Sequence, residues 1–309
     1  MGSSLLKRKT VKFLSMTRDE LEKAFSNESC LFVPTLALTT SKSKNFREAF
    51  INLLPGEKVT FTQREESSLS LTCLNGNSEL CHPKIPPIGL SSHLDSYCFY
   101  VRFESIVGEF VITNPYDEPV IIQVVSGRSL NSIFSTCDLS SKSPRPIYRT
   151  EDSFLDKENE RVFRIVPAYV KSLGNYQITK LRENIVDSKE RQGRICCHQH
   201  DSSMMQEMFL SFDQGTTFPI MKHLDKSESL LVLDGSLVYR IYDDFGEIIG
   251  QVSMHGFQMK NCSASDPFYI WINRDTFHSP LVNSTALLAK ETTSGPFKPS
   301  DTVLLDLDL

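Results

Sequence analysis

Short apolar segments separated by turn residues run through this chain, and they constrain its fold more than any other feature. They have the length of strands, and they are rich in β-branched and aromatic residues. Many short strands with turns between them are typical of sandwiches and barrels. The sequence therefore predicts a fold dominated by β-structure, with strands at CFYVRF (98–103), EFVIT (109–113), PVIIQVV (119–125), VFRIV (162–166), SLLVL (229–233), SLVYRIY (236–242) and PFYIWI (267–272).

Helical patterns are few and short. Residues 17–26 open with Thr17 and carry Glu20 three positions later, which is the capping-box pattern in front of a helix. A second helix is predicted over residues 178–190, where apolar side chains recur at helical spacing.

A polar segment divides the chain into two halves of similar length. Residues 138–160 are charged, contain two prolines and carry little apolar sequence, which is typical of a linker or a long surface loop. We therefore predict one domain over residues 1–165 and another over residues 166–309.

The two halves share a spacing of glycines. Gly56 and Gly76 are 20 residues apart, and so are Gly215 and Gly235, with each pair offset from the other by 159 positions. A repeated spacing of this kind favours an internal duplication, although few residues are identical. The alternative is that the first half is an unrelated β-sandwich.

Composition narrows the class of protein. The formal net charge of −5 argues against a general nucleic-acid-binding protein, which needs a basic excess. Neither a transmembrane segment nor a secretory signal is recognisable, and the eight cysteines form no CxxC pair, so we expect a cytoplasmic protein with reduced thiols. Gly2, followed by three basic residues, only weakly matches a lipidation motif.

The most specific pattern lies between Gly215 and Gly235. Met221 and His223 are two positions apart, so on a strand their side chains share one face. Glu228 would return on the next strand after a tight turn, and His278 follows a later predicted strand. Inside a barrel these side chains would converge on one point.

This spacing resembles the first motif of the cupin superfamily, G-x5-H-x-H-x3,4-E-x6-G, with His278 in the place of the second motif's histidine. More narrowly, residues 178–309 resemble the WbuC-type cupin-fold metalloproteins. The resemblance implies a double-stranded β-helix, or jelly-roll barrel. It also implies a divalent metal (Fe, Zn, Mn or Ni), a sugar-derived ligand as in RmlC-like cupins, and dimerisation through the sheets.

The sequence departs from that pattern at the first ligand. Met221 stands where the motif has histidine, so His223, Glu228 and His278 match only three of four metal positions. Two histidines and one carboxylate can still bind Fe(II) or Zn(II). The equivalent positions of the first half are Thr62, Arg64 and Leu69, which predicts a degenerate N-terminal barrel without this site.

Weaker candidates surround the motif. Met221, His200, Tyr239 and Trp271 are candidates for the wall of a ligand pocket, although core packing is the commoner role of aromatic residues in strands. His200 lies two residues after another histidine in the sequence CCHQH, and each of these histidines could equally be an exposed side chain.

Two functions from different classes remain open. The first is a bicupin whose C-terminal barrel binds a divalent metal and a small polar ligand, as an isomerase, epimerase or oxygenase. The second is a metal-free, degenerate bicupin that serves as a binding or assembly module. Met221 and the altered first half favour the second, whereas His223, Glu228 and His278 favour the first.

Overall fold

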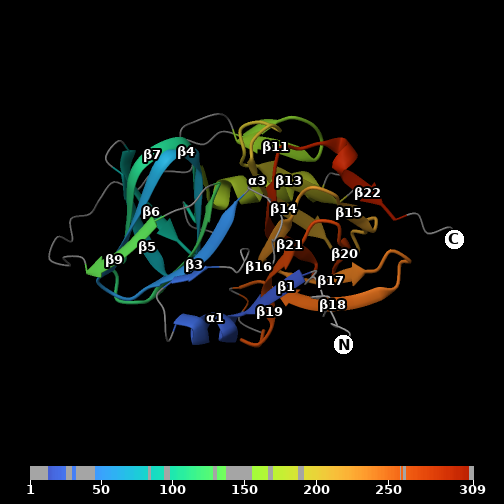
Figure 1. Ribbon diagram of the computed structural model, residues 1–309, viewed down its shortest axis with the longest axis horizontal. Helices are drawn as coiled ribbons and strands as arrows, with labels where there is room; N and C mark the ends of the chain where they lie inside the picture. Colours follow the sequence, from blue (N-terminus) through green and yellow to red (C-terminus); the bar gives the residue numbers. More distant parts are fainter. Residues whose placement is uncertain are drawn as a thin grey trace, which may run out of the picture.

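The computed structural model describes residues 13–25, 30–32, 46–82, 85–93, 98–127, 131–136, 155–165, 170–186, 191–257, 259 and 262–305. Within these residues, strands make up most of the regular structure, together with two α-helices and one short 3-10 helix. The strands form two barrels that lie side by side (Figure 1). The predicted all-β character with a few short helices is confirmed.

Two sheets enclose the C-terminal barrel. The eight-stranded sheet has the order β1 (Phe13–Thr17), β19 (Pro267–Ile272), β16 (Glu228–Asp234), β21 (Ala286–Ser294), β14 (Met205–Asp213), β13 (Gln192–Cys196), β11 (Val162–Ile165) and β10 (Leu155–Lys157). The five-stranded sheet has the order β18 (Ile248–His255), β17 (Ser236–Tyr242), β20 (Phe277–Val282), β15 (Met221–His223) and β22 (Thr302–Leu304), and the 3-10 helix η2 (Pro299–Asp301) leads into β22. Apolar side chains from both sheets share one core, because each sheet turns alternate residues inward.

One nine-stranded sheet forms the N-terminal barrel. Its main path runs β2 (Cys30–Phe32), β3 (Arg47–Leu53), β8 (Val120–Ser126), β4 (Glu57–Asn75), β7 (Tyr100–Thr113), β5 (Asn77–His82) and β6 (Ile85–Ser91). In addition, β9 (Asn131–Thr136) pairs with β4, and β12 (Val170–Leu173) pairs with β7. The strands predicted at 98–103 and 109–113 are parts of the single long strand β7. The interior is a tightly buried apolar core, and Leu69, one of the three equivalent positions, lies in it.

The strands cross the boundary predicted at residue 165. β1 precedes the N-terminal barrel in sequence, yet it pairs with β19 of the C-terminal barrel. β10 and β11 extend the C-terminal sheet, whereas β12, which follows them, returns to the N-terminal sheet. Of the predicted linker, residues 138–154 lie outside the described residues, and Leu155–Lys157 form strand β10.

Both predicted helices occur. α1 (Arg18–Phe25) begins directly after Thr17, whose hydroxyl accepts a hydrogen bond from the Glu20 amide at 3.1 Å. The Glu20 carboxylate accepts one from the Thr17 amide at 2.8 Å, so the capping box is complete. α3 (Asn175–Val186) starts three residues earlier than predicted, and residues 187–190 of the prediction lie outside the described residues. Neither helix in the described part of the chain is long and apolar enough to cross a membrane.

The repeated glycines occupy equivalent turns. Gly76 follows β4 and Gly235 follows β16, with φ angles of 72° and 84°, a region that disfavours side chains. A Cβ atom would lie 2.6 Å from the Pro119 carbonyl oxygen at Gly76 and 2.2 Å from the Ala286 carbonyl oxygen at Gly235. The same close approach of backbone therefore recurs in both halves.

A buried polar network joins the two barrels. Arg102 of β7 forms ion pairs at 2.7 Å with Glu104 and with Glu207 of β14, and Glu207 also pairs with Lys290 of β21 at 2.7 Å. The side chains of Arg102, Glu207 and Lys290 are fully buried. Because Glu207 and Lys290 lie on the outer face of the C-terminal sheet, they meet Arg102 at the interface, while the inner face of the same sheet is left to line the barrel.

Candidate functional site

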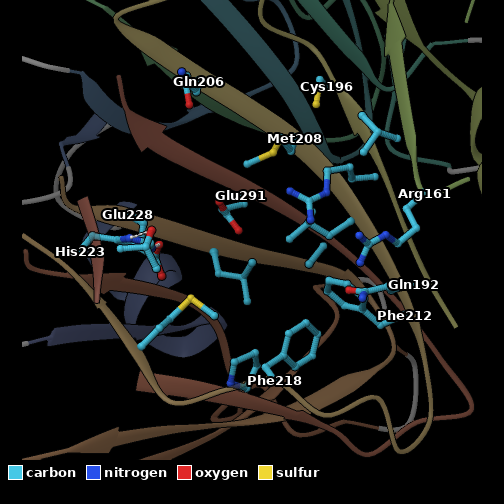
Figure 2. A pocket seen from close by; sticks show the side chains of 18 of the residues that line it. Arg161, Gln192, Cys196, Gln206, Met208, Phe212, Phe218, His223, Glu228 and Glu291 are labelled. Carbon is cyan, nitrogen blue, oxygen red and sulfur yellow. Dashed lines mark hydrogen bonds and ion pairs between the residues drawn. The ribbon is translucent and has the colours of Figure 1, made fainter. Parts of the chain in front are cut away.

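Three predicted metal ligands converge inside the C-terminal barrel. His223 ends β15, Glu228 begins β16, and His278 lies on β20. The Nε2 atom of His278 lies 3.0 Å from Oε1 of Glu228, and the Nε2 atom of His223 lies 3.3 Å from Oε2. All three residues are buried, and Figure 2 shows His223 and Glu228 at one end of a cavity. The structure therefore brings together the residues that the sequence places far apart.

A second layer of contacts orients these side chains. Nδ1 of His278 lies 2.8 Å from the Thr276 carbonyl oxygen, an acceptor, so Nδ1 carries the proton and Nε2 is left free when the ring is neutral. Nδ1 of His223 lies 3.2 Å from the Thr302 hydroxyl. The Tyr239 hydroxyl donates to Oε1 of Glu228 at 2.9 Å. Such partners are typical of metal-binding histidines and carboxylates.

The donor atoms fit one divalent cation. Two donors at about 2.1 Å from a metal lie about 3.0 Å apart in adjacent octahedral positions and about 3.4 Å apart in a tetrahedron. The observed separations of 3.0 and 3.3 Å match these values, and one donor atom from each residue lies within 4.8 Å of the others. Two imidazoles and one carboxylate suit Fe(II) or Zn(II) and leave further coordination positions open.

Charge is concentrated at this cluster. Burial alone would raise the pKa of Glu228, but the neighbouring His278 and His223 outweigh it and hold that pKa well below its usual range. Burial opposes protonation of His278, yet Glu228 raises its pKa above the ordinary value. Burial and the Glu228 charge both raise the pKa of Tyr239, which keeps its hydroxyl a hydrogen-bond donor. The carboxylate is therefore anionic, as metal binding requires.

The cluster opens into a cavity of about 510 Å³. Its inner sheet wall is largely apolar, with Met208, Leu210, Phe212 and Leu230 among the lining residues. In Figure 2 the cavity runs from His223 and Glu228, past Glu291, to Arg161, Gln192 and Phe212. A volume of this size is typical of sites for small molecules.

Of the four weaker candidates, two line the cavity and two do not. Met221 and Tyr239 line the cavity, and Met221 lies opposite His278 in the β15–β20 pairing. Trp271 does not line it, because alternate residues of β19 face opposite ways: Ile270 and Ile272 point into the barrel, whereas Trp271 packs in the interface core. His200 is exposed in the turn after β13 and is not a lining residue either.

His198 takes the place predicted for His200. It is buried, lines the cavity, and its Nδ1 lies 3.1 Å from the Glu207 carbonyl oxygen. Burial lowers its pKa to about 4, so it is neutral at physiological pH. The two histidines of CCHQH are not on a strand, because β13 ends at Cys196, and strand alternation therefore misplaces them.

Several lining residues carry no sequence signal of their own. Glu291 and Arg194 each lie at an inward position of a strand, and their neighbours in sequence give no motif. Arg161 comes directly after the segment predicted as a loop (138–160), and the end of that segment forms the first half of the β10–β11 hairpin. Knowledge of the register across β21, β14 and β13 would have placed Glu291 and Arg194 on the cavity wall.

A second cluster of donor atoms lies elsewhere. His255, Cys262 and Asp266 bring one donor atom each within 4.8 Å of the others, and all three are partly exposed. Among the described residues of the N-terminal barrel, no three His, Cys, Asp or Glu side chains come together in this way.

Among the comparisons with known proteins, the solved structures identify the fold. A family model described as a domain of unknown function (DUF6016) matches residues 174–254, and no curated protein is similar enough to match. The crystal structure of salicylate 1,2-dioxygenase from Pseudaminobacter salicylatoxidans is 11% identical and matches with a TM-score of 0.65 over 98% of this chain and 91% of that chain. The adducts of the same enzyme with gentisate match at 10% identity and a TM-score of 0.65, over 96% of this chain and 86% of that chain.

A cupin 2 conserved barrel domain protein from Leptotrichia buccalis also matches, at 10% identity and a TM-score of 0.51, over 94% of this chain and 99% of that chain. These matches span both halves of the chain. The chain therefore has the cupin fold in a two-barrel arrangement, as predicted, and the narrower resemblance to WbuC-type proteins stays a prediction.

Proposed function

We propose that the C-terminal barrel binds a divalent metal through His223, Glu228 and His278, and that it binds a small molecule in the cavity beside the metal. One observation carries the proposal: two imidazole nitrogens and a carboxylate converge at adjacent-ligand distances of 3.0 and 3.3 Å at the end of a 510 Å³ cavity. A metal held by three protein ligands keeps positions open for a small molecule.

The residues around the site have distinct tasks. The metal would supply Lewis-acid or redox chemistry at its open positions. Tyr239 and the two Nδ1 contacts fix the carboxylate and the rings, so little reorganisation is needed on binding. The apolar wall at Leu230 and Met208 limits the access of water to a bound molecule.

Among reaction classes, we favour an oxygenase. The ligand set of two histidines and one carboxylate is that of non-haem Fe(II) oxygenases, which bind substrate and oxygen at open positions. The similarity to salicylate 1,2-dioxygenase supports this choice only indirectly, because it is a similarity of fold alone. An isomerase or epimerase of a sugar-derived molecule is the alternative enzyme.

A metal-free binding or assembly module is the second candidate. Glu228 bonds both histidines, so the three side chains satisfy one another without a cation. Met221, at a position where cupins have a ligand histidine, favours this candidate too.

Elemental analysis separates the two candidates. We expect about one equivalent of Fe, Zn, Mn or Ni in the untagged protein, and loss of that metal in the His223→Ala plus His278→Ala variant. The matched control is His93→Ala, because His93 is exposed on the other barrel. Circular dichroism establishes that both variants are folded. Absence of metal from the wild-type protein, even after reconstitution with each ion, would refute the metal site and leave the binding module.

A further inference from the structure

The cavity ends in a cationic wall opposite the proposed metal site. Arg194 of β13 and Arg161 of the β10–β11 turn both line it, and the Arg194 amide donates to the Arg161 carbonyl oxygen at 2.8 Å. The side chain of Asn159 accepts hydrogen bonds from the Arg161 and Val162 amides at 2.9 and 3.0 Å, which fixes this turn. The backbone therefore holds the two arginines at neighbouring positions.

Arg194 differs from Arg164, a third arginine that lines the cavity. Arg164 is paired with Glu158 and with Asp201, and it also donates to the His198 carbonyl oxygen. Among the residues that the structure describes, by contrast, no carboxylate lies within ion-pair distance of the Arg194 guanidinium and no acceptor is hydrogen-bonded to it. The buried carboxyl of Glu291, on the same cavity lining, interacts with Arg194 electrostatically without forming an ion pair. A half-buried guanidinium on a cavity wall without an ion-pair partner is typical of a site for an anionic ligand group.

The sheet register gives the distance between the two ends. Arg194 lies opposite Leu210, Leu210 opposite Ala289, and Ala289 opposite Val232, so Arg194 is three strands away from β16. Glu228 lies four residues before Val232 on that strand. At about 4.8 Å per strand and 3.3 Å per residue the Cα atoms are about 19 Å apart. When both side chains extend toward each other along the cavity, roughly 10 Å is left between the guanidinium and the metal-binding atoms.

Apolar side chains fill the space between the ends. Leu210 and Met208 lie on the sheet between Arg194 and Glu228, and Phe212 and Phe218 pack edge to face with ring centroids 4.8 Å apart on the same cavity wall. Glu291 is the only carboxyl among the described lining residues of this stretch, and in Figure 2 it lies between the two ends. The middle of the cavity therefore suits an apolar body with few hydrogen-bonding groups.

From this arrangement we infer that the ligand is an elongated organic acid, about 10 Å long. Its polar head reaches the metal, its apolar body lies along Met208 and Leu210, and its terminal oxyanion pairs with Arg194, while the neighbouring Arg161 adds positive charge to the same wall. A carboxylate and a phosphate share this chemistry. The inference rests on the proposed function, because the metal defines the end that the head group contacts.

Binding of synthetic probes tests the inference. Suberic acid monohydroxamate has a metal-binding head, an apolar chain and a terminal carboxylate at about this separation, and its ω-amide differs only in the absence of the charge. We expect the acid to bind the metal-loaded full-length protein about tenfold more tightly than the amide, which corresponds to about 1.4 kcal/mol, in isothermal titration calorimetry. The ω-phosphonate distinguishes a phosphate preference from a carboxylate preference. Succinic acid monohydroxamate is too short to span both ends and should show no gain over its amide.

Variants assign the effect to the arginine. Arg194→Gln should remove the preference for the acid and leave amide binding unchanged, and Arg161→Gln should reduce that preference. Arg182→Gln is the matched control, because Arg182 pairs with Asp234 outside the cavity. Equal binding of acid and amide by the wild-type protein, binding of none of the probes, or an acid preference that survives in Arg194→Gln overturns the inference.

The same titrations in metal-free protein keep the two proposals apart. If the hydroxamate head gains nothing from added metal while the acid still binds better than the amide, the metal site fails and the oxyanion site stands. If metal improves binding but the terminal charge does not, the metal site stands and the oxyanion site fails.

Discussion

Glu48 provides a quantitative prediction about the interface between the barrels. Its carboxyl group is fully enclosed there, and it accepts hydrogen bonds from the Ser229 hydroxyl at 2.8 Å, from the Gln123 amide at 3.2 Å and from the Tyr269 hydroxyl. Burial raises the pKa of Glu48 from 4.5 to about 7, although these hydrogen bonds partly oppose the shift. The carboxyl group is therefore largely protonated in the folded protein below about pH 7 and ionised in the unfolded chain above about pH 5.

The direction of the effect follows from this difference. A group whose pKa is higher in the folded state stabilises the fold at low pH and loses that contribution as the pH rises through the folded value. For a shift from 4.5 to about 7, the loss between pH 5 and pH 8.5 amounts to about 2.5 kcal/mol. Glu48→Gln abolishes this loss, because an amide has nearly the same shape as the protonated acid and can donate to the Tyr269 oxygen.

Urea unfolding across this pH range measures the difference. The free energy of unfolding of Glu48→Gln minus that of the wild type should increase by about 2.5 kcal/mol from pH 5 to pH 8.5. Glu22→Gln, on the exposed face of α1, is the matched control for removal of a carboxyl group. A Glu48→Gln difference that stays constant within about 0.5 kcal/mol, or that decreases as the pH rises, would refute the reasoning.

Three further predictions concern other parts of the molecule. Glu207→Leu leaves Lys290 without its ion-pair partner and Arg102 with Glu104 alone, so urea unfolding should show a loss of about 3 to 5 kcal/mol; a loss below about 1 kcal/mol would contradict the role of the network. Gly235→Ala should lower the free energy of unfolding by more than about 2 kcal/mol, because of the positive φ of this position and the nearby carbonyl oxygen. Gly215→Ala, which has open space around the added Cβ, should lower it by only about 1 kcal/mol in the same assay. Tyr239→Phe removes the hydrogen bond to Glu228 and should weaken metal binding about 10- to 100-fold in competition with a chelator, and an unchanged affinity would show that this contact does not orient the carboxylate.

Part of the fold could be predicted from the sequence because strand alternation and turns are local signals. The segments that form β16 and β19 alternate between the barrel core and the interface, and the segment that forms β17 alternates between the barrel core and partly exposed positions, as its apolar pattern indicates. The spacing of His223 and Glu228 was also informative, because two short strands joined by a turn have few ways to orient their side chains.

Other features depend on contacts between distant segments. Residues 156–161 are polar on their own, and the segment that contains them becomes a hairpin because β10 pairs with β11, which in turn pairs with β13. Trp271 lies in a strand with aromatic residues at neighbouring positions, so its sequence cannot show which face meets the cavity. The charges of Arg102 and Glu207 carry no local signal of burial, because each becomes buried only through the other.

The pairing of β1 with β19 has a consequence for synthesis on the ribosome. Phe13 lies opposite Ile272, so the first described strand has to wait for about 260 further residues before its partner is made. At 5 to 20 residues per second this delay is about 13 to 50 s. During that time Leu14 and Met16, which pack in the core between the two barrels of the folded protein, have no native partner strand. The nascent chain therefore exposes an apolar strand until β19 has been made, and binding by a chaperone in this interval would protect it from mispairing.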